Sequence, residues 1–166
     1  MKKTKIPIRY VPKNLSKKDK QKQIKMLMKS KKLYRTKHQY YTRKPLASYK
    51  NKTSKHILKA RKIYNIQNLT PSKELARKTG CSLSALNKIV KKGQGAYFSS
   101  GSRPNQTPQS WGVARLASSI TAGKAAAVDY DIINAGCDHK KKAYILANKS
   151  RRQYKYGQSR TRRVNV

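Results

Sequence analysis

Carboxylates and histidines, the side chains that most often transfer protons in enzymes, are scarce in this sequence. Its 166 residues include five Asp and Glu and three His. Only Asp129 and Asp131 lie close together, and side chains two positions apart in a helix point to different faces. No spacing of Cys and His residues matches a zinc site. We therefore expect no enzyme, no catalytic residue, no metal and no cofactor.

The chemistry that the sequence does offer is hydrogen bonding and positive charge along residues 74–93, ELARKTGCSLSALNKIVKKG. Gly80 separates two helical patterns, and Ser82 precedes the second as its N-cap. This spacing resembles a helix-turn-helix with Leu86 and Ile89 on its buried face. The side chains that would then face a DNA groove are those of Ser84, Ala85, Asn87, Lys88 and Lys91. A purely structural helical hairpin needs the same glycine and cap, so both interpretations stay open.

A second candidate site is the Gly- and Ser-rich segment 93–107, GQGAYFSSGSRPNQT. The backbone amides of such a loop can hold a phosphate, and Arg103 would add a positive charge. The segment lacks the lysine spacing of a Walker motif and the strand context of a dinucleotide fingerprint. An ordered loop whose small side chains let Trp111 pack closely explains the same residues.

Positive charge dominates the composition. The chain carries 42 Lys and Arg against five Asp and Glu, a net charge of +37. Residues 93–137 carry only +1, whereas 1–92 carry +27 and 138–166 carry +9. Such a charge calls for acidic or polyanionic partners, and nucleic acid is the most obvious one. Outside residues 84–91, the cations expected to contact such a partner are Lys17, Lys18, Arg35, Lys37, Arg43, Lys44, Arg103, Arg151, Arg152, Arg160, Arg162 and Arg163.

Helical periodicity is frequent and strand patterns are sparse, which predicts a mainly α fold. Ser16 followed by Asp19 resembles a capping box, and Ser54, Thr70-Pro71 and Thr107-Pro108 are further helix-start signals. The glycines at 80, 93 and 136 are expected to end helices, and Asp138 to cap the last one. The expected helices span about 17–31, 55–65, 71–80, 83–92, 108–120, 124–135 and 139–148.

These elements suggest a small helical module with long, basic, extended arms at both termini. The N-terminal arm would span 1–53 with one helix, and the basic C-terminal tail 149–166. The module, 54–148, would contain a hairpin over 71–92, the loop 93–107, and helices over 108–120 and 124–135. Its structural core is expected to include Trp111, Gly80, Leu86, Ile89 and Gly93.

The two cysteines, Cys81 and Cys137, are expected to be small buried thiols of a protein in a reducing compartment. No apolar run is long enough to span a membrane.

The segment GQGAYFSSGSRPNQTPQSWGVARLASSITAGKAAAVDYDI resembles an uncharacterised family of small basic proteins of large double-stranded DNA viruses. The strings KHILKARKIYNI and LARKTGCSLSALNKIV extend the similarity to about residues 54–137, and Ser100–Trp111 is its most specific part. The family has no assigned activity. The resemblance therefore implies a virion setting, synthesis in the host cytoplasm or nucleus, and no catalytic residues.

We therefore expect a non-enzymatic structural protein of a large DNA virus particle. It would be a minor capsid or cement protein on the inner side of the shell, in contact with capsid proteins and possibly with packaged double-stranded DNA. The alternative is a DNA-binding or genome-condensing protein, histone-like or acting through residues 74–93. A third class, a lysine-rich regulator of transcription, requires the Ser84–Lys91 face to be exposed. We expect neither a membrane span nor a small-molecule substrate.

Overall fold

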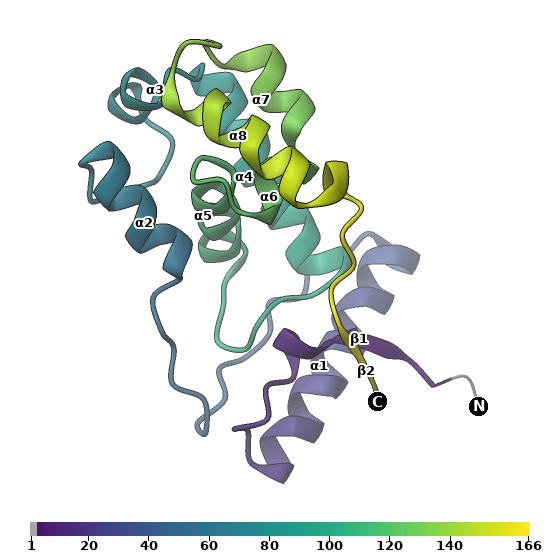
Figure 1. The fold of residues 1–166 in the computed structure, drawn as a ribbon. Coiled ribbons are helices and arrows are strands. Elements are labelled where there is room, and N and C mark those ends of the chain that lie inside the picture. Colours follow the sequence, from purple (N-terminus) through teal and green to yellow (C-terminus); the bar gives the residue numbers. More distant parts are fainter. Residues whose placement is uncertain (1–2) are drawn as a thin grey trace. The chain divides into compact units, whose positions relative to one another are not determined.

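A computed structural model describes residues 3–166 and shows a mainly α-helical protein, as the sequence predicts (Figure 1). None of the helices within 3–166 combines the length and the apolar character needed to cross a bilayer. The two strands are β1 (Lys5–Pro7) and β2 (Arg163–Asn165), and the 3-10 helices are η1 (Ile8–Tyr10) and η2 (Lys155–Gly157). The α-helices in this range are α1 (Lys17–Lys37), α2 (Lys55–Tyr64), α3 (Lys73–Thr79), α4 (Leu83–Ser99), α5 (Pro108–Ser119), α6 (Lys124–Val128), α7 (Tyr130–Gly136) and α8 (Lys142–Gln153).

The chain forms two compact units, each assembled from separate stretches of sequence. Unit 1 contains residues 3–52, Gln94–Trp111 and Arg160–Val166, and unit 2 contains Thr53–Gly93 and Gly112–Ser159. This differs from the expected division into arm, module and tail. The expected division followed the density of cations along the sequence. The few apolar residues of the two charged ends pack against each other inside unit 1, so these ends belong to a compact unit.

The core of unit 1 consists mainly of side chains from the N-terminal stretch. Ile6, Tyr10, Leu27 and Leu46 are almost completely buried there. Trp111 is only partly buried at the edge of this cluster, with its ring edge-on to that of Tyr10 at a centroid distance of 5.9 Å. Trp111 therefore packs in unit 1, and the expectation that it anchors the core of a 54–148 module is wrong.

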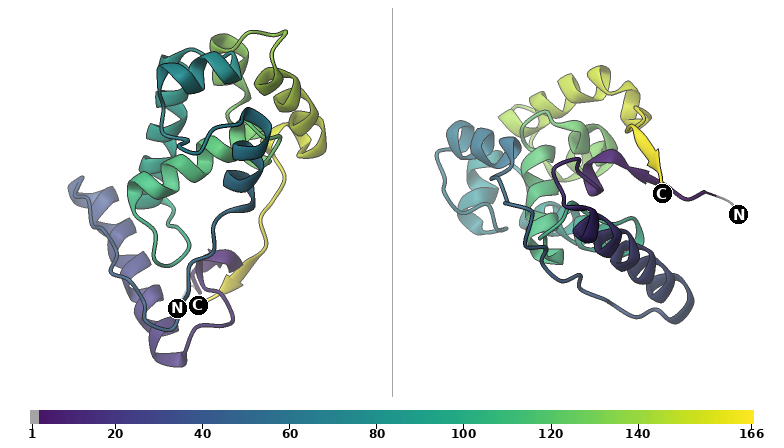
Figure 2. Two further views of the ribbon diagram at one scale, coloured as in Figure 1. Left: turned by 90° about the vertical axis from the view of Figure 1, so that its left-hand side faces the viewer. Right: turned by 90° about the horizontal axis from the view of Figure 1, so that it is seen from below.

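Both ends of the described chain are held together by β1 and β2, which lie side by side and antiparallel (Figure 2). Ile6 is opposite Val164, and the amide of Ile8 donates to the carbonyl of Arg162 at 3.0 Å. The tail predicted to be extended is therefore partly regular, since α8 takes in residues 149–153 and β2 pairs with β1.

Helix α1 begins as predicted and ends later. The Ser16 hydroxyl accepts a hydrogen bond from the amide of Asp19 at 3.2 Å, which confirms this N-cap. The Asp19 carboxylate accepts hydrogen bonds from the hydroxyl and the amide of Ser48, and these bonds lower the pKa of Asp19. The helix runs on to Lys37 and ends at His38 in the left-handed region.

Unit 2 is built around fully buried side chains of its helices, among them those of Leu75, Leu86, Ile89, Leu116 and Ile133. Helix α8 packs on α6 and α7 (Figure 1). The caps at Ser54 and Thr107 are confirmed, because their hydroxyls accept from the amides of His56 and Ser110.

Helix α3 starts later than expected. Its N-cap is Ser72, whose hydroxyl accepts from the amide of Leu75 at 3.1 Å, so the expected start at Thr70-Pro71 is wrong. The physical reason is a local turn, in which the Asn68 side chain accepts from the amide of Thr70 at 2.9 Å.

The sequence predicts that Gly93 ends a helix, and this is wrong. Helix α4 continues through Gly93 to Ser99. A Cβ atom on Gly93 would lie 2.6 Å from the Cα of Gly112 in α5. The glycine allows α4 and α5 to approach closely, and residues 94–99 of the expected loop are helical.

Two further helix predictions need correction. The segment 124–135 forms two helices, α6 and α7, because the chain leaves helical geometry at Asp129. The last helix starts at Lys142 instead of 139, because the Asp138 side chain accepts from the amide of Lys140 in a turn and does not cap the helix.

Cys81 and Cys137 form a disulfide bond, so the expectation of two separate thiols is wrong. The two residues also pair as a β-bridge, with hydrogen bonds on either side of them. The amide of Ser82 donates to Gly136, and that of Asp138 to Gly80, each at 2.7 Å. The bond joins the turn between α3 and α4 to the end of α7, across a sequence separation of 56 residues. Such bonds persist in oxidising surroundings, which removes the basis for expecting a reducing compartment.

Removal of the disulfide, by Cys81→Ala with Cys137→Ala, should lower the free energy of unfolding of unit 2 by about 4 kcal/mol, since the crosslink restricts a long loop in the unfolded chain. Urea unfolding with and without reductant measures this. Reductant should lower the free energy of unfolding of the wild-type protein and leave that of the double variant unchanged. Two titratable thiols in the folded, oxidised wild type would contradict the bond.

Gly93→Ala and Gly95→Ala should have opposite effects, although both replace a glycine of α4. Gly93→Ala should cost about 1–3 kcal/mol, because its methyl group collides with the backbone of Gly112. Gly95→Ala meets nothing within 4 Å and should gain about 0.5–1 kcal/mol in helix propensity. Thermal unfolding of both variants checks the pair, and equal effects would count against this packing of α4 on α5.

Candidate nucleic-acid interface

Helices α3 and α4 are joined by a tight turn of residues 80–82, as the sequence predicts. Gly80 adopts a positive φ of 76°, and its amide donates to the carbonyl of Ala76 at 2.9 Å. The Ser82 hydroxyl accepts from the amide of Ala85 at 3.1 Å and caps α4. Leu86 and Ile89 are completely buried, which fixes the rotation of α4 about its own axis.

The opposite face of α4 is open to solvent. Ser84, Asn87, Lys88 and Lys91 are all exposed. Their spacing of three, one and three residues places them along one face of the helix. Ala85 is 4% exposed and packs next to Gly136, so the prediction that it faces a groove is wrong. Its small side chain serves the packing of α4 on α7.

The exposed side chains of α4 have the chemistry that reads base pairs. An asparagine amide can bond N6 and N7 of adenine, a lysine can bond O6 and N7 of guanine, and a serine hydroxyl suits several bases. In helix-turn-helix proteins, the first residues of the second helix reach the base edges. Ser84, Asn87 and Lys88 occupy the first turns of α4, and the partly exposed Leu83 precedes them.

The surface of unit 2 is strongly cationic. The unit contains 19 Lys and Arg against four Asp and Glu. Helix α3 exposes Lys73 and Arg77, and its one acid, Glu74, lies 3.4 Å from the ammonium group of Lys78. A helix pair with this charge is attracted to a phosphate backbone before any base is read.

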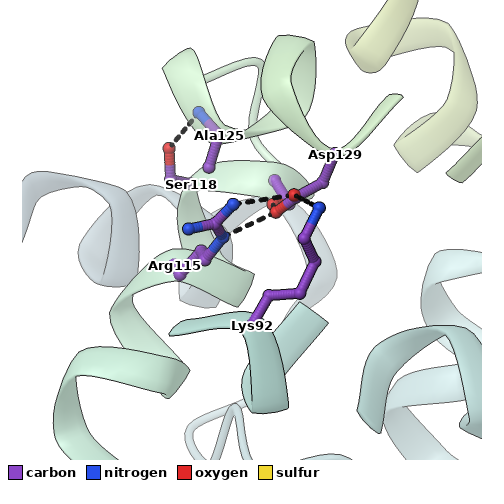
Figure 3. A network of polar contacts seen from close by, with 6 residues as sticks. Lys92, Arg115, Ser118, Ala125 and Asp129 are labelled. Atoms are coloured by element: carbon purple, nitrogen blue, oxygen red, sulfur yellow. Dashed lines mark hydrogen bonds and ion pairs between the residues drawn. The ribbon is translucent and has the colours of Figure 1, made fainter. Parts of the chain in front are cut away.

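One acid of unit 2 lies in its interior. The side chain of Asp129 is 0% exposed, and its oxygens bind Nε and Nη2 of Arg115, both at 2.8 Å (Figure 3). Nζ of Lys92 lies 3.1 Å from the same carboxylate. Since Lys92 belongs to α4, Arg115 to α5 and Asp129 to the junction of α6 and α7, the cluster fixes α4 within unit 2.

The sequence correctly separates Asp129 from Asp131, which is exposed. It does not reveal the partners of Asp129. The only sequence signal is that Asp129 follows the apolar run AAAV, where a carboxylate needs a cation if the run is buried.

The sequence predicts that Arg43 contacts an anionic partner at the surface. This is wrong, because Arg43 is only 6% exposed. Its guanidinium donates to the Ser30 hydroxyl at 3.0 Å, the Tyr97 carbonyl at 2.9 Å and the Ser102 hydroxyl at 2.7 Å. It also lies 3.8 Å from the centroid of the Tyr97 ring. Burial lowers the pKa of Arg43. Its guanidinium therefore donates its hydrogen bonds to groups inside unit 1.

The remaining predicted contacts are mostly exposed. Arg151 is half-buried and lies over the rings of Tyr130 and Tyr156, at 4.3 and 5.0 Å. Of the exposed cations, Arg152 belongs to unit 2 and the others to unit 1. Those in unit 1 are Lys17, Lys18, Arg35, Lys37, Lys44, Arg103, Arg160, Arg162 and Arg163.

Asp129→Asn should lower the free energy of unfolding of unit 2 by about 3 kcal/mol, because it leaves Arg115 and Lys92 without their counter-charge. Asp131→Asn makes the same chemical change at an exposed position of α7 and should shift stability by less than about 0.5 kcal/mol. Chemical denaturation of the two variants measures the difference. Equal losses would show that the buried cluster contributes nothing of its own.

Comparison with known proteins places the chain in a family without assigning a function. No curated protein and no solved structure matches it at a significant level. A family model described as a family of unknown function (DUF5824) matches residues 7–143. The match includes the α3–α4 pair and the Asp129 cluster, and it covers most of the sequence. The chain therefore belongs to this family of unknown function.

Proposed function

We propose that the protein binds duplex DNA through the exposed face of α4. The observation that carries this proposal is the division of α4 into two faces. Leu86 and Ile89 are buried, while Ser84, Asn87, Lys88 and Lys91 are exposed directly after the Gly80 turn. A structural hairpin would also expose a polar face, so the proposal depends on which groups stand there: one amide, one hydroxyl and two ammonium groups suit base edges and phosphates.

Electrostatics favours the same partner. Over the residues described, unit 1 carries a net charge of +21 and unit 2 of +15. Each phosphate neutralised by a lysine or arginine releases counterions, so affinity should fall steeply with salt. Lys88 and Lys91 on α4, with Lys73 and Arg77 on α3, are exposed and would supply phosphate contacts.

A minor capsid role has less support in the contacts. That role would suit the expected basic arms if they ran extended along acidic surfaces of capsid proteins. Residues of both ends instead pack within unit 1, through β1 with β2 and through the buried Ile6 and Tyr10. Contacts inside unit 1 account for the conformation of these residues.

Asn87→Ala tests base reading without any change in charge. We expect a preferred duplex to emerge from selection among random sequences. The substitution should weaken binding to that duplex about tenfold or more, since one good amide–base contact is worth about 1–3 kcal/mol. Affinity for random duplex should stay the same. The matched control is Asn134→Ala, at an exposed position of α7, which should leave both affinities unchanged. Fluorescence anisotropy at fixed salt measures the six affinities of the wild type and the two variants for the two duplexes.

Several outcomes would overturn the proposal. One is the absence of any preferred duplex, and another is an equal loss for the Asn87 and Asn134 variants. A third is retention of the protein on capsid shells from which DNA has been removed, which would identify the capsid as its partner.

A further inference from the structure

Unit 1 contains a polar hollow of about 240 Å³ that the α4 interface does not use. Two segments far apart in sequence line most of it, one after Leu46 and the other after Ser102. They contribute Tyr49, Lys50, Asn51, Lys52, Arg103 and Gln106. Three of these six side chains are cationic and two are amides, and no carboxylate lines the hollow.

The two walls are fixed to each other by Asn105. Its side-chain oxygen accepts from the amide of Leu46 at 2.6 Å, and its side-chain nitrogen donates to the carbonyls of Leu46 and Tyr49 at 3.2 and 2.8 Å. The side chain of Asn51 donates in return to the carbonyl of Asn105 at 3.0 Å. Asn105 itself has a positive φ of 59°. This network sets the spacing of the walls before any ligand arrives.

The buried Arg43 is linked by hydrogen bonds to the wall of the hollow that contains Arg103 and Gln106. It donates to the Ser102 hydroxyl, which in turn donates to the carbonyl of Arg103 at 2.8 Å. The backbone from which the Arg103 side chain extends is therefore attached to a buried cation, while the side chain is exposed to solvent. A flexible surface lysine would have no such support.

Among residues 3–166, no Asp or Glu lines the hollow or forms an ion pair with its cations. Asp19 is the only acid in unit 1, and both the amide and the hydroxyl of Ser48 bind its carboxylate. Lys50, Lys52 and Arg103 all line this space, so their positive charges lie around it and repel one another. A bound anion would reduce that repulsion.

We propose that this hollow binds a phosphate ester, with Arg103 and Lys52 holding the anion and Tyr49 contacting the attached sugar or base. Arginine and lysine are the side chains that bind phosphate in proteins, and amide nitrogens such as those of Asn51 and Gln106 can donate to its oxygens. The volume lies below the roughly 300–1,000 Å³ of typical sites for drug-sized ligands, so the hollow has room for the phosphate and part of the attached sugar, with the rest of the ligand outside. The ester comes either from a free nucleotide or from a nucleic-acid backbone.

Arg103→Gln tests the site, with Lys25→Gln as a control that removes the same charge from an exposed position of α1 in the same unit. Adenosine monophosphate and a short DNA duplex serve as probes in separate titrations at constant ionic strength. Amide NMR shifts of Asn51, Arg103 and Gln106 report occupancy. Wild type should saturate with at least one probe, and Arg103→Gln should weaken that binding about tenfold. Lys25→Gln should change it less than twofold.

The two probes distinguish the sources of the phosphate. Saturation by the mononucleotide assigns the hollow to a free nucleotide, and saturation by the duplex alone assigns it to a nucleic-acid backbone. No saturable shift with either probe, or equal losses for the two variants, would overturn the proposal. Because Asn87 is intact in both variants, failure here leaves the α4 proposal untouched, and binding here can persist in the Asn87→Ala protein.

Discussion

The ion pairs of the Asp129 carboxylate with Arg115 and Lys92 join α4, α5 and the junction of α6 and α7 inside unit 2. A buried carboxylate in a protein of net charge +37 is tolerable only where cations meet it at hydrogen-bonding distance, and here both do. The carboxylate also attracts Lys92 of α4, and the cluster as a whole keeps a net charge of +1. The exposed face of α4 carries Lys88 and Lys91 without disturbing the packing of the buried face.

Unit 1 resolves the same conflict between charge and burial in a different way. Its buried cation, Arg43, has no carboxylate beside it and is held by two hydroxyls, one carbonyl and the face of Tyr97. Neutral partners leave its charge uncompensated, so the guanidinium contributes to the potential of the surrounding surface. Both units therefore keep their outer surfaces positive, which is the property that an anionic partner would recognise.

Local signals in the sequence predicted most of the helices and the α3–α4 hairpin, because caps, turn glycines and apolar spacing act over a few residues. Ser16, Ser54, Gly80 and Thr107 are examples. The errors arise where a distant contact overrides the local signal. The local sequence predicts a helix end at Gly93, but the residue allows close contact with Gly112. It predicts a surface cation at Arg43, which Ser102 and Tyr97 enclose. It predicts a free thiol at Cys81, which forms a disulfide bond with Cys137. No single-residue pattern carries that information.

The pairing of β1 with β2 has a consequence for the order in which the protein can fold during synthesis. Unit 2 has all of its residues once Ser159 has been made, whereas β1 must wait until residues 163–165 leave the ribosome. Ile6 and its neighbours therefore remain without their strand partner until residues 163–165 have been made. The earliest part of the described chain is among the last to be completed, and during that interval its apolar side chains are open to chaperones and to other nascent chains.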